Sequence, residues 1–200
     1  MHTETAIVIL AAGRSSRLGQ PKQLLPFKGK SLLLHIVQTA KKVSDKVYVI
    51  LGANSTRIQT DIKSCGAKIV FNEEWEEGMA SSIRCGLGVL KSDLPELKSA
   101  IFMVCDQPFV TSDLLESLIK EKDLSGKSII ASSYSEIVGT PVLFDESIFS
   151  EMMELKGDIG ARKIILKSKD RLATVDFPLG NVDMDTAEDY KKLLAQKDLM

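Results

Sequence analysis

The sequence has few of the residues that build disulfide frameworks, zinc sites and histidine-based catalysts. Its 200 residues include three cysteines and two histidines. Cys65, Cys85 and Cys105 form no C-x-x-C pair, which argues against a disulfide framework or a structural zinc site and predicts free thiols. His2 is terminal and His35 falls within a helical pattern, so we expect no histidine acting as a catalytic base.

A large excess of one charge and a long apolar run are also missing. The chain carries 26 basic and 27 acidic residues, with the two signs interspersed. We therefore expect neither nucleic acid nor a membrane as a partner. No stretch approaches the roughly 18 apolar residues of a transmembrane helix and the N-terminus lacks a signal pattern, so we expect a cytoplasmic protein. The hydrophobic content of 44% predicts that residues 1–200 form a single globular domain.

Short apolar runs alternate with segments of helical spacing along the chain. The run at 100–105 is almost continuously apolar, as expected of a central strand that is buried on both faces. Ser31, Thr111 or Ser112, and Thr186 are expected to cap the helices that follow them. The alternation predicts an α/β fold with three layers and a central, mostly parallel sheet. Strands are expected at residues 6–10, 46–51, 67–71, 100–105 and 128–132, and helices near 31–40, 54–63, 80–87, 111–119 and 187–194.

A glycine-punctuated basic loop, LAAGRSSRLGQPKQ, follows the first expected strand. Gly13 and Gly19 permit backbone conformations in which successive N–H groups converge on one anion. Arg14, Arg17 and Lys22 add positive charge that suits a polyphosphate. The spacing fits neither the P-loop nor the dinucleotide-binding pattern. A solvated basic turn is the alternative, which the crowding of cations and glycines at a strand end disfavours.

Carboxylates are expected at the same edge of the sheet as this loop. Asp106 directly follows the strand at 100–105, and the carboxyl ends of strands in open α/β sheets form the ligand crevice. Asp183 and Asp185 occupy alternate positions in an extended segment, so their side chains point the same way. Together the carboxylates predict a hard oxygen site for Mg²⁺. A turn or a helix cap is the alternative role for Asp106 and Asp185.

Two further glycine-containing segments lie late in the chain. Gly157 and Gly160 bracket a helix start with Arg162 in its first turn, and the free N–H groups there predict a second anion site. A capped surface helix is the alternative. Gly139 and Pro141 are expected to shape a loop.

Several of these segments together resemble one family. The loop A-A-G-R-S-S-R-L-G-x-P-K-Q resembles the signature loop of nucleotidyltransferases with a GT-A-type, Rossmann-like fold, and most closely that of the molybdenum cofactor cytidylyltransferases. C-D-Q-P, G-T-P-V-L-F and D-x-D-T-x-E-D match further family segments in the same order. The resemblance therefore spans nearly the whole chain. It implies nucleotide contacts from Ala11, Ala12, Gly13, Arg14, Lys22 and Asp106, catalytic roles for Arg14, Arg17, Lys22 and Asp106, and metal binding by Asp106, Asp183 and Asp185.

The acidic segment NEEWEEGMASSIRCGL resembles the family loop that holds the base and ribose. This implies nucleotide contacts from Gly78, Ser81 and Ser82. Arg84 is either a phosphate contact or a surface residue, and Trp75 is expected to pack rather than to stack on a ligand. The family places the acceptor substrate near Gly139, Gly157, Asp158, Gly160 and Arg162.

The resemblance implies transfer of CMP from CTP to the terminal phosphate of the molybdopterin cofactor. The products would be pyrophosphate and the cytosine dinucleotide cofactor of hydroxylases such as xanthine dehydrogenase. A transient contact with such a hydroxylase or its chaperone is implied as well. Members that transfer CMP carry an alanine at the position of Ala12, where guanylyl-transferring relatives carry glycine.

Two other functions remain open from the sequence. One is a pyrophosphorylase or cytidylyltransferase that acts on a sugar phosphate or an isoprenoid precursor. The other is a non-enzymatic chaperone that binds a nucleotide or a cofactor.

Overall fold

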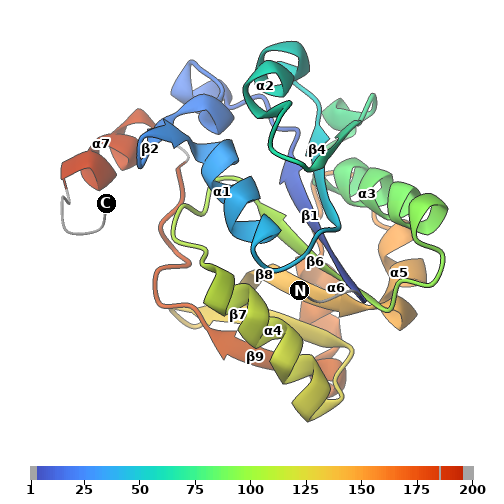
Figure 1. Ribbon diagram of the computed structural model, residues 1–200. Coiled ribbons are helices and arrows are strands. Elements are labelled where there is room, and N and C mark those ends of the chain that lie inside the picture. The colour runs from blue at the N-terminus through green and yellow to red at the C-terminus, as the bar shows by residue number, and fades with distance from the viewer. Residues whose placement is uncertain (1–3, 185, 196–200) are drawn as a thin grey trace.

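The computed structural model describes residues 4–184 and 186–195 (Figure 1). Its main sheet consists of the strands β1 Thr5–Ala11, β4 Val47–Leu51, β5 Lys68–Phe71, β6 Ser99–Val104, β7 Ile129–Tyr134, β8 Ile137–Asp145 and β9 Leu172–Asp176. The seven strands lie in the order β5-β4-β1-β6-β8-β7-β9. A separate small hairpin pairs β2 Pro26–Phe27 with β3 Lys30–Ser31.

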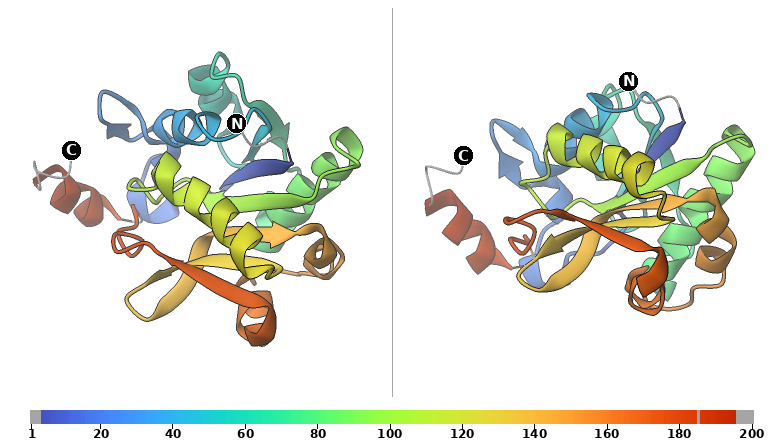
Figure 2. Two further views of the ribbon diagram at one scale, coloured as in Figure 1. Left: turned by 60° about the horizontal axis from the view of Figure 1, so that its bottom comes forward. Right: turned by 90° about the horizontal axis from the view of Figure 1, so that it is seen from below.

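Helices cover both faces of the sheet (Figure 2). One face carries α1 Leu32–Lys41, α2 Ser55–Ile62 and α4 Ser112–Ser125, and the other carries α3 Met79–Asp93, α5 Glu146–Met153 and α6 Arg162–Lys167. The last helix is α7 Ala187–Ala195, and the short 3-10 turns are η1 Ser16–Leu18, η2 Lys22–Leu24, η3 Trp75–Glu77 and η4 Lys169–Arg171. None of the described helices has the length and apolar character needed to cross a bilayer.

Strand β1 shows how the sequence pattern gives three layers. All of its residues are buried, and successive side chains point to opposite faces. Ile7 and Ile9 enter the core beneath α1, α2 and α4, whereas Val8 and Leu10 enter the core beneath α3, α5 and α6. Residues 6–11 are therefore all apolar, and the buried hydroxyl of Thr5 forms a hydrogen bond of 2.7 Å with Ser99 Oγ. The predicted three-layer α/β fold is confirmed.

The strand directions bring several loops to one edge of the sheet. β1 pairs in parallel with β4 on one side and with β6 on the other, and β4 pairs in parallel with β5. In this sheet, among the described residues, β8 is the strand that runs antiparallel to its neighbours. The chain places β4 and β5 on one side of β1 and then returns to place β6 on the other side. At such a switch point a crevice forms outside the carboxyl ends of the two adjacent strands, here β1 and β6.

Helix caps follow the sequence signals at three positions. Ser31 Oγ accepts a hydrogen bond of 3.1 Å from Leu34 N, and Thr111 Oγ1 accepts one of 3.2 Å from Leu114 N. Thr186 Oγ1 accepts a hydrogen bond of 3.1 Å from Asp189 N. The three cysteines are free thiols, as predicted.

The prediction of a loop around Gly139 and Pro141 is wrong, because both residues lie within β8. The register of β8 against β7 shifts between Ala131 and Ser132, so residues 140 and 141 form a bulge in the ladder. Proline is tolerated at such a point because its missing N–H breaks no regular ladder bond. A Cβ at position 139 would lie 2.5 Å from Tyr134 Oη, so packing accounts for the glycine.

Candidate active site

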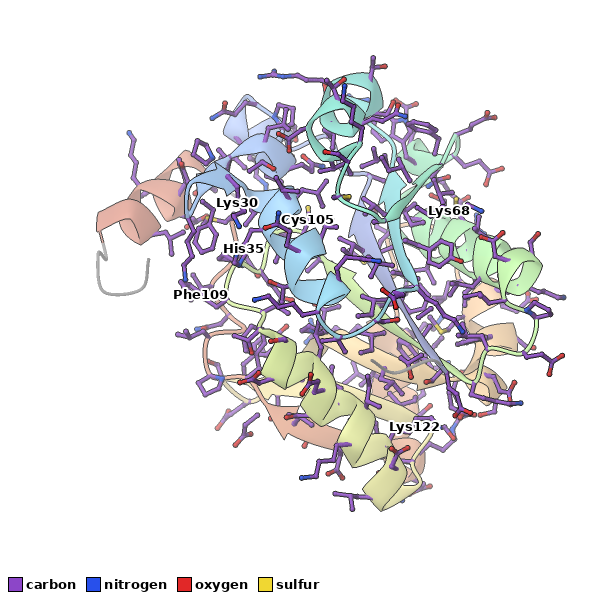
Figure 3. All side chains as sticks on the ribbon, in the orientation of Figure 1. Lys30, His35, Lys68, Cys105, Phe109 and Lys122 are labelled. Atoms are coloured by element: carbon purple, nitrogen blue, oxygen red, sulfur yellow. The ribbon has the colours of Figure 1, made fainter. Side chains whose placement is uncertain are left out.

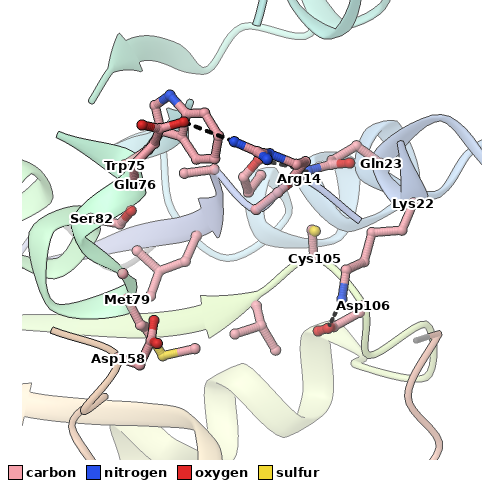
Figure 4. Close-up of a pocket in the computed structure, with 16 residues that line it drawn as sticks. Arg14, Lys22, Gln23, Trp75, Glu76, Met79, Ser82, Cys105, Asp106 and Asp158 are labelled. Carbon is pink, nitrogen blue, oxygen red and sulfur yellow. Dashed lines mark hydrogen bonds and ion pairs between the residues drawn. The ribbon is translucent and has the colours of Figure 1, made fainter. Parts of the chain in front are cut away.

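A cavity of about 750 Å³ opens at the carboxyl edge of the sheet (Figure 4). The loop after β1 and the end of β6 form part of its lining, as the parallel topology predicts. The start of α3 and the loop before α6 complete the lining. The contributing segments are residues 10–14, 22–23, 75–76, 78–79, 82, 104–106 and 158.

Lys22 and Asp106 form an ion pair on the cavity lining. Lys22 Nζ lies 2.6 Å from Asp106 Oδ2, and the side chains are 15% and 18% exposed. The other carboxylate oxygen, Asp106 Oδ1, is buried and accepts no hydrogen bond from the described residues. A buried carboxylate oxygen without a donor is suited to a cation, so Asp106 fits the divalent metal expected here.

The structure describes one of the other two predicted metal ligands, Asp183. Met184 N donates a hydrogen bond of 3.1 Å to Asp106 O, which brings the segment that carries Asp183 beside the end of β6. Asp185 lies outside the described residues. Across residues 4–184 and 186–195, no group of three or more His, Cys, Asp and Glu side chains could hold a metal. Of the predicted metal ligands, Asp106 therefore lies on the cavity lining and Asp183 lies in the segment beside it.

The three cations of the basic loop take different positions. Lys22 reaches inward to Asp106, whereas Arg14 lies at the cavity mouth, where its Nη2 donates to Glu76 Oε1 at 2.8 Å. The Arg14 guanidinium also lies 5.1 Å from the ring centroid of Trp75. Arg17 is exposed on η1 and is not part of the cavity lining. The structure thus brings two of the three predicted cations to the cavity.

Of the two serines at the start of α3 that were predicted to contact the nucleotide, only one lines the cavity. Ser82 lines the cavity, but Ser81 is 2% exposed and does not. Ser81 Oγ donates to Gly78 O at 2.8 Å, and both hydroxyls accept hydrogen bonds from Asn72 Nδ2, at 2.8 and 3.0 Å. Ser81 is therefore engaged in holding the turn before α3. Asn72 is a supporting residue that the sequence analysis missed.

The segment before α6, where a second anion site was predicted, packs against the start of α3. Gly157 O accepts a hydrogen bond of 3.0 Å from Ala80 N, so this segment rests against the first turn of α3. Asp158 lines the same cavity as the basic loop. The residues predicted with it lie elsewhere: Gly157, Gly160 and the exposed Arg162 are not among the lining residues.

Arg84 and Trp75 have structural contacts. Arg84 donates to Leu155 O at 2.6 Å and to both oxygens of Glu77, and the hydrogen bond from Arg84 lowers the pKa of Glu77. Arg84 therefore joins α3 to the chain after α5 instead of facing the cavity. Trp75 packs so closely on Gly52 that a Cβ there would lie 2.5 Å from Trp75 Cβ. Trp75 therefore packs against Gly52, as predicted, and its side chain also lines the cavity.

The buried Gln107 connects β8 to the segment that follows β9. Gln107 Nε2 donates to Gly180 O at 2.9 Å, and Gln107 Oε1 accepts a hydrogen bond of 3.1 Å from Thr140 Oγ1. Burial raises the pKa of the neighbouring Tyr134, and the negative charge of Asp183 adds to the increase.

Comparison with known protein families identifies the family to which this chain belongs. A family model described as a MobA-like NTP transferase domain matches residues 7–172. The chain belongs to this family. It is therefore a nucleotidyltransferase, and its fold agrees with that expected from the basic loop. The MobA-like domain covers both the loop after β1 and Asp106 after β6.

Several curated proteins resemble this MobA-like transferase. The purine catabolism protein PucB of Bacillus subtilis is 28% identical over 92% of this chain and 92% of its own length. Nicotine blue oxidoreductase of Paenarthrobacter nicotinovorans is 28% identical over 94% of this chain and 95% of its own. The bifunctional protein GlmU of Lawsonia intracellularis is 31% identical, but the match spans 60% of this chain and only 26% of GlmU.

Solved structures support the same assignment. Rv0371c of Mycobacterium tuberculosis is 31% identical, with a TM-score of 0.83 over 98% of this chain and 100% of that protein. Its complex with manganese superposes with a TM-score of 0.78 at 29% identity. The molybdopterin-guanine dinucleotide biosynthesis protein A of Archaeoglobus fulgidus, at 18% identity and a TM-score of 0.69, shows that the fold is shared. Members of this family use a divalent metal, which agrees with the donor-free oxygen of Asp106.

Proposed function

We propose that this transferase moves CMP from CTP to the terminal phosphate of the molybdopterin cofactor and releases pyrophosphate. The observation that carries the proposal is the juxtaposition of Lys22 with Asp106, whose second oxygen is buried without a donor, beside a cavity large enough for a nucleotide. A cation and a metal-binding carboxylate side by side are the groups that nucleotidyl transfer requires.

The transfer needs no protein base. An oxygen of the acceptor phosphate forms a bond to the α-phosphorus of CTP, and the bond from that phosphorus to the pyrophosphate oxygen breaks, with pyrophosphate taking the electron pair. A phosphate monoester has a second pKa of about 6, so the nucleophile is already anionic near neutral pH. The described histidine agrees with this, because His35 packs against the Phe27 ring at 4.8 Å and is not part of the cavity lining (Figure 3).

The protein's contribution is then positioning and neutralisation of charge. Lys22 lies within the cavity and would shift from Asp106 to the oxygens of the triphosphate. Asp106 and Asp183 would hold Mg²⁺, which supplies further neutralisation of the phosphates when it is bound. Arg14 at the mouth is free to turn inward once it leaves Glu76, because both side chains are largely exposed. Groups fixed in place before the reaction stabilise the transition state without reorganising.

The preference for a pyrimidine rests on Ala12. Its side chain is 7% exposed and lines the cavity. Its carbonyl accepts a hydrogen bond of 3.0 Å from Ala53 N, so the backbone cannot easily retreat from a bulky ligand. A methyl group held in this way favours a one-ring base over a two-ring base. Steric selection of this kind is modest, on the order of 1–3 kcal/mol.

The choice of acceptor rests on the family resemblance and on two relatives. PucB is named for purine catabolism and the Paenarthrobacter relative is named an oxidoreductase, and each matches nearly the whole chain. Xanthine is a purine, so a cofactor for xanthine-oxidising hydroxylases is consistent with the name of PucB. The acceptor would contact Asp158 and the edge near Gly139 and Arg162, and the product would pass to a hydroxylase or its chaperone.

Mass spectrometry of the product tests the proposal. The protein is incubated with molybdenum-bearing molybdopterin cofactor, Mg²⁺ and equal concentrations of CTP, GTP and ATP, and pyrophosphate release is followed in parallel. We expect the cytosine dinucleotide as the main product. Transfer only to a sugar phosphate or an isoprenoid precursor would show that the molybdopterin cofactor is not the acceptor. Binding of nucleotide without turnover on any acceptor would instead support a chaperone.

A further inference from the structure

A buried amide lies next to the catalytic lysine on η2. Gln23 is 1% exposed, and its Nε2 donates to Ala11 O at 2.7 Å and to Gly13 O at 3.1 Å. The carbonyl between them, Ala12 O, accepts the hydrogen bond from Ala53 N. Three consecutive carbonyl groups after β1 are thus each held by a donor from the protein, and Gln23 supplies two of those hydrogen bonds.

The direction of these carbonyls determines where the loop's N–H groups point. In a planar trans peptide, the carbonyl of one residue and the N–H of the next point in opposite directions. The carbonyls of Ala11 and Gly13 share the donor Gln23 Nε2, so the N–H groups of Ala12 and Arg14 are both turned away from Gln23. These residues line the cavity. Backbone N–H groups of one loop that are turned to the same side can together bind an anion.

Gln23 is also linked to the backbone of Lys22. Ser15 Oγ donates to Gln23 Oε1 at 3.4 Å and accepts a hydrogen bond of 3.0 Å from Lys22 N. Ser15 has a left-handed backbone with a φ of 57°, a conformation that such contacts help to maintain. The N–H groups after β1 and the Lys22 backbone are therefore held in one hydrogen-bonded unit around Gln23.

We propose that Gln23 is a positioning residue for the triphosphate. It does not need to touch the nucleotide, because it acts through the carbonyls of Ala11 and Gly13 and through Ser15. The inference rests on the proposed function only in taking a nucleoside triphosphate as the ligand of the loop. A glutamine that merely filled space could be replaced by an apolar side chain of similar volume without an effect on phosphate binding.

The test uses Gln23→Met and inorganic tripolyphosphate, a probe that carries no base or ribose. Tripolyphosphate with Mg²⁺ is titrated into ¹⁵N-labelled protein, and the amide signals of Ala12, Gly13 and Arg14 are followed. In the unmodified protein these amides should shift together. In Gln23→Met the shifts should be lost and the affinity should fall by about tenfold or more, as for removal of preorganised donors. The KM for CTP should rise with it, whereas the KM for the acceptor should stay the same.

Gln38→Met is the matched control, because Gln38 is exposed on α1, where its side chain accepts a hydrogen bond from Lys30 Nζ, and it is not among the cavity-lining residues. It should bind tripolyphosphate as the unmodified protein does. If Gln23→Met does not fold, Gln23→Asn keeps the amide but is one methylene shorter, so it should still weaken binding. A folded Gln23 variant with unchanged affinity and amide shifts overturns the positioning role. If the unmodified protein binds neither tripolyphosphate nor any nucleotide, the proposed nucleotide site itself is wrong.

Discussion

The carboxylate of Asp106 can be tested by a change that keeps its shape. Asp106→Asn removes the negative charge but leaves an oxygen that can still accept a hydrogen bond from Lys22 Nζ, now 2.6 Å from the carboxylate. The variant also removes the donor-free oxygen that we assign to the metal. Two effects should follow, a moderate loss of stability and a large loss of turnover.

The structure allows both magnitudes to be estimated. The side chains of the pair are 15% and 18% exposed, so the interaction lies between a surface and a fully buried ion pair. Its loss should lower the free energy of unfolding by about 1–3 kcal/mol. A domain with about 5 kcal/mol or more of stability would remain more than roughly nine-tenths folded. The loss of transition-state stabilisation should lower turnover by at least about a hundredfold, so unfolding cannot account for it.

The assay is release of pyrophosphate at saturating Mg²⁺, CTP and acceptor, with thermal unfolding measured on the same samples. Asp113→Asn is the matched control, because Asp113 is an exposed carboxylate in the first turn of α4 and is not among the cavity-lining residues. Its turnover should be unchanged. Near-normal turnover of Asp106→Asn at saturating Mg²⁺ would refute the metal-binding role.

Three further substitutions test separate parts of the cavity. Lys22→Ala should weaken CTP binding and cost about 3 kcal/mol of transition-state stabilisation, whereas an unchanged rate and affinity would place Lys22 outside the reaction. Glu76→Gln should release Arg14 and lower the KM for CTP by up to about fivefold, because exposed ion pairs are weak; a KM that does not change even at low salt would mean that Arg14 does not reach the triphosphate. Ala12→Gly should reduce the CTP-to-GTP ratio of kcat/KM by up to about a hundredfold when both nucleotides compete in one assay. A clear preference of the unmodified enzyme for GTP would contradict the cytidylyl assignment.

The part of the fold that sequence reasoning predicted well is the parallel half. β1, β4 and β6 are buried on both faces, so each appears in the sequence as an uninterrupted apolar run. β9 was missed because it pairs only with β7 at the sheet edge and has exposed or half-buried residues throughout. β8 was missed because Gly139 and Pro141 are more often turn residues than strand residues. In both cases the tertiary context, not the local pattern, makes the strand.

The site was predictable where it depends on topology and unpredictable where it depends on the path of a loop. Lys22 and Asp106 were expected to meet because parallel strands bring their carboxyl ends to one edge. Gln23 and Asn72 were missed because nothing in a sequence tells which carbonyl or hydroxyl a buried amide will reach. Their role depends on backbone atoms, which every residue possesses, so no pattern of residue types reveals it.

The glycines of the site show the same limit in another form. Gly78 was expected to contact the nucleotide and Gly160 to form part of an anion site, yet a Cβ at Gly78 would collide with Asp158 and one at Gly160 would lie 2.7 Å from Met79 Sδ. These glycines bring the segment before α6 against the start of α3, so the sides of the cavity expected to hold the nucleotide and the acceptor share one wall. Gly13 differs, because a Cβ there would meet nothing within 4 Å. Its open side faces the cavity, which leaves space for a ligand to approach the backbone closely.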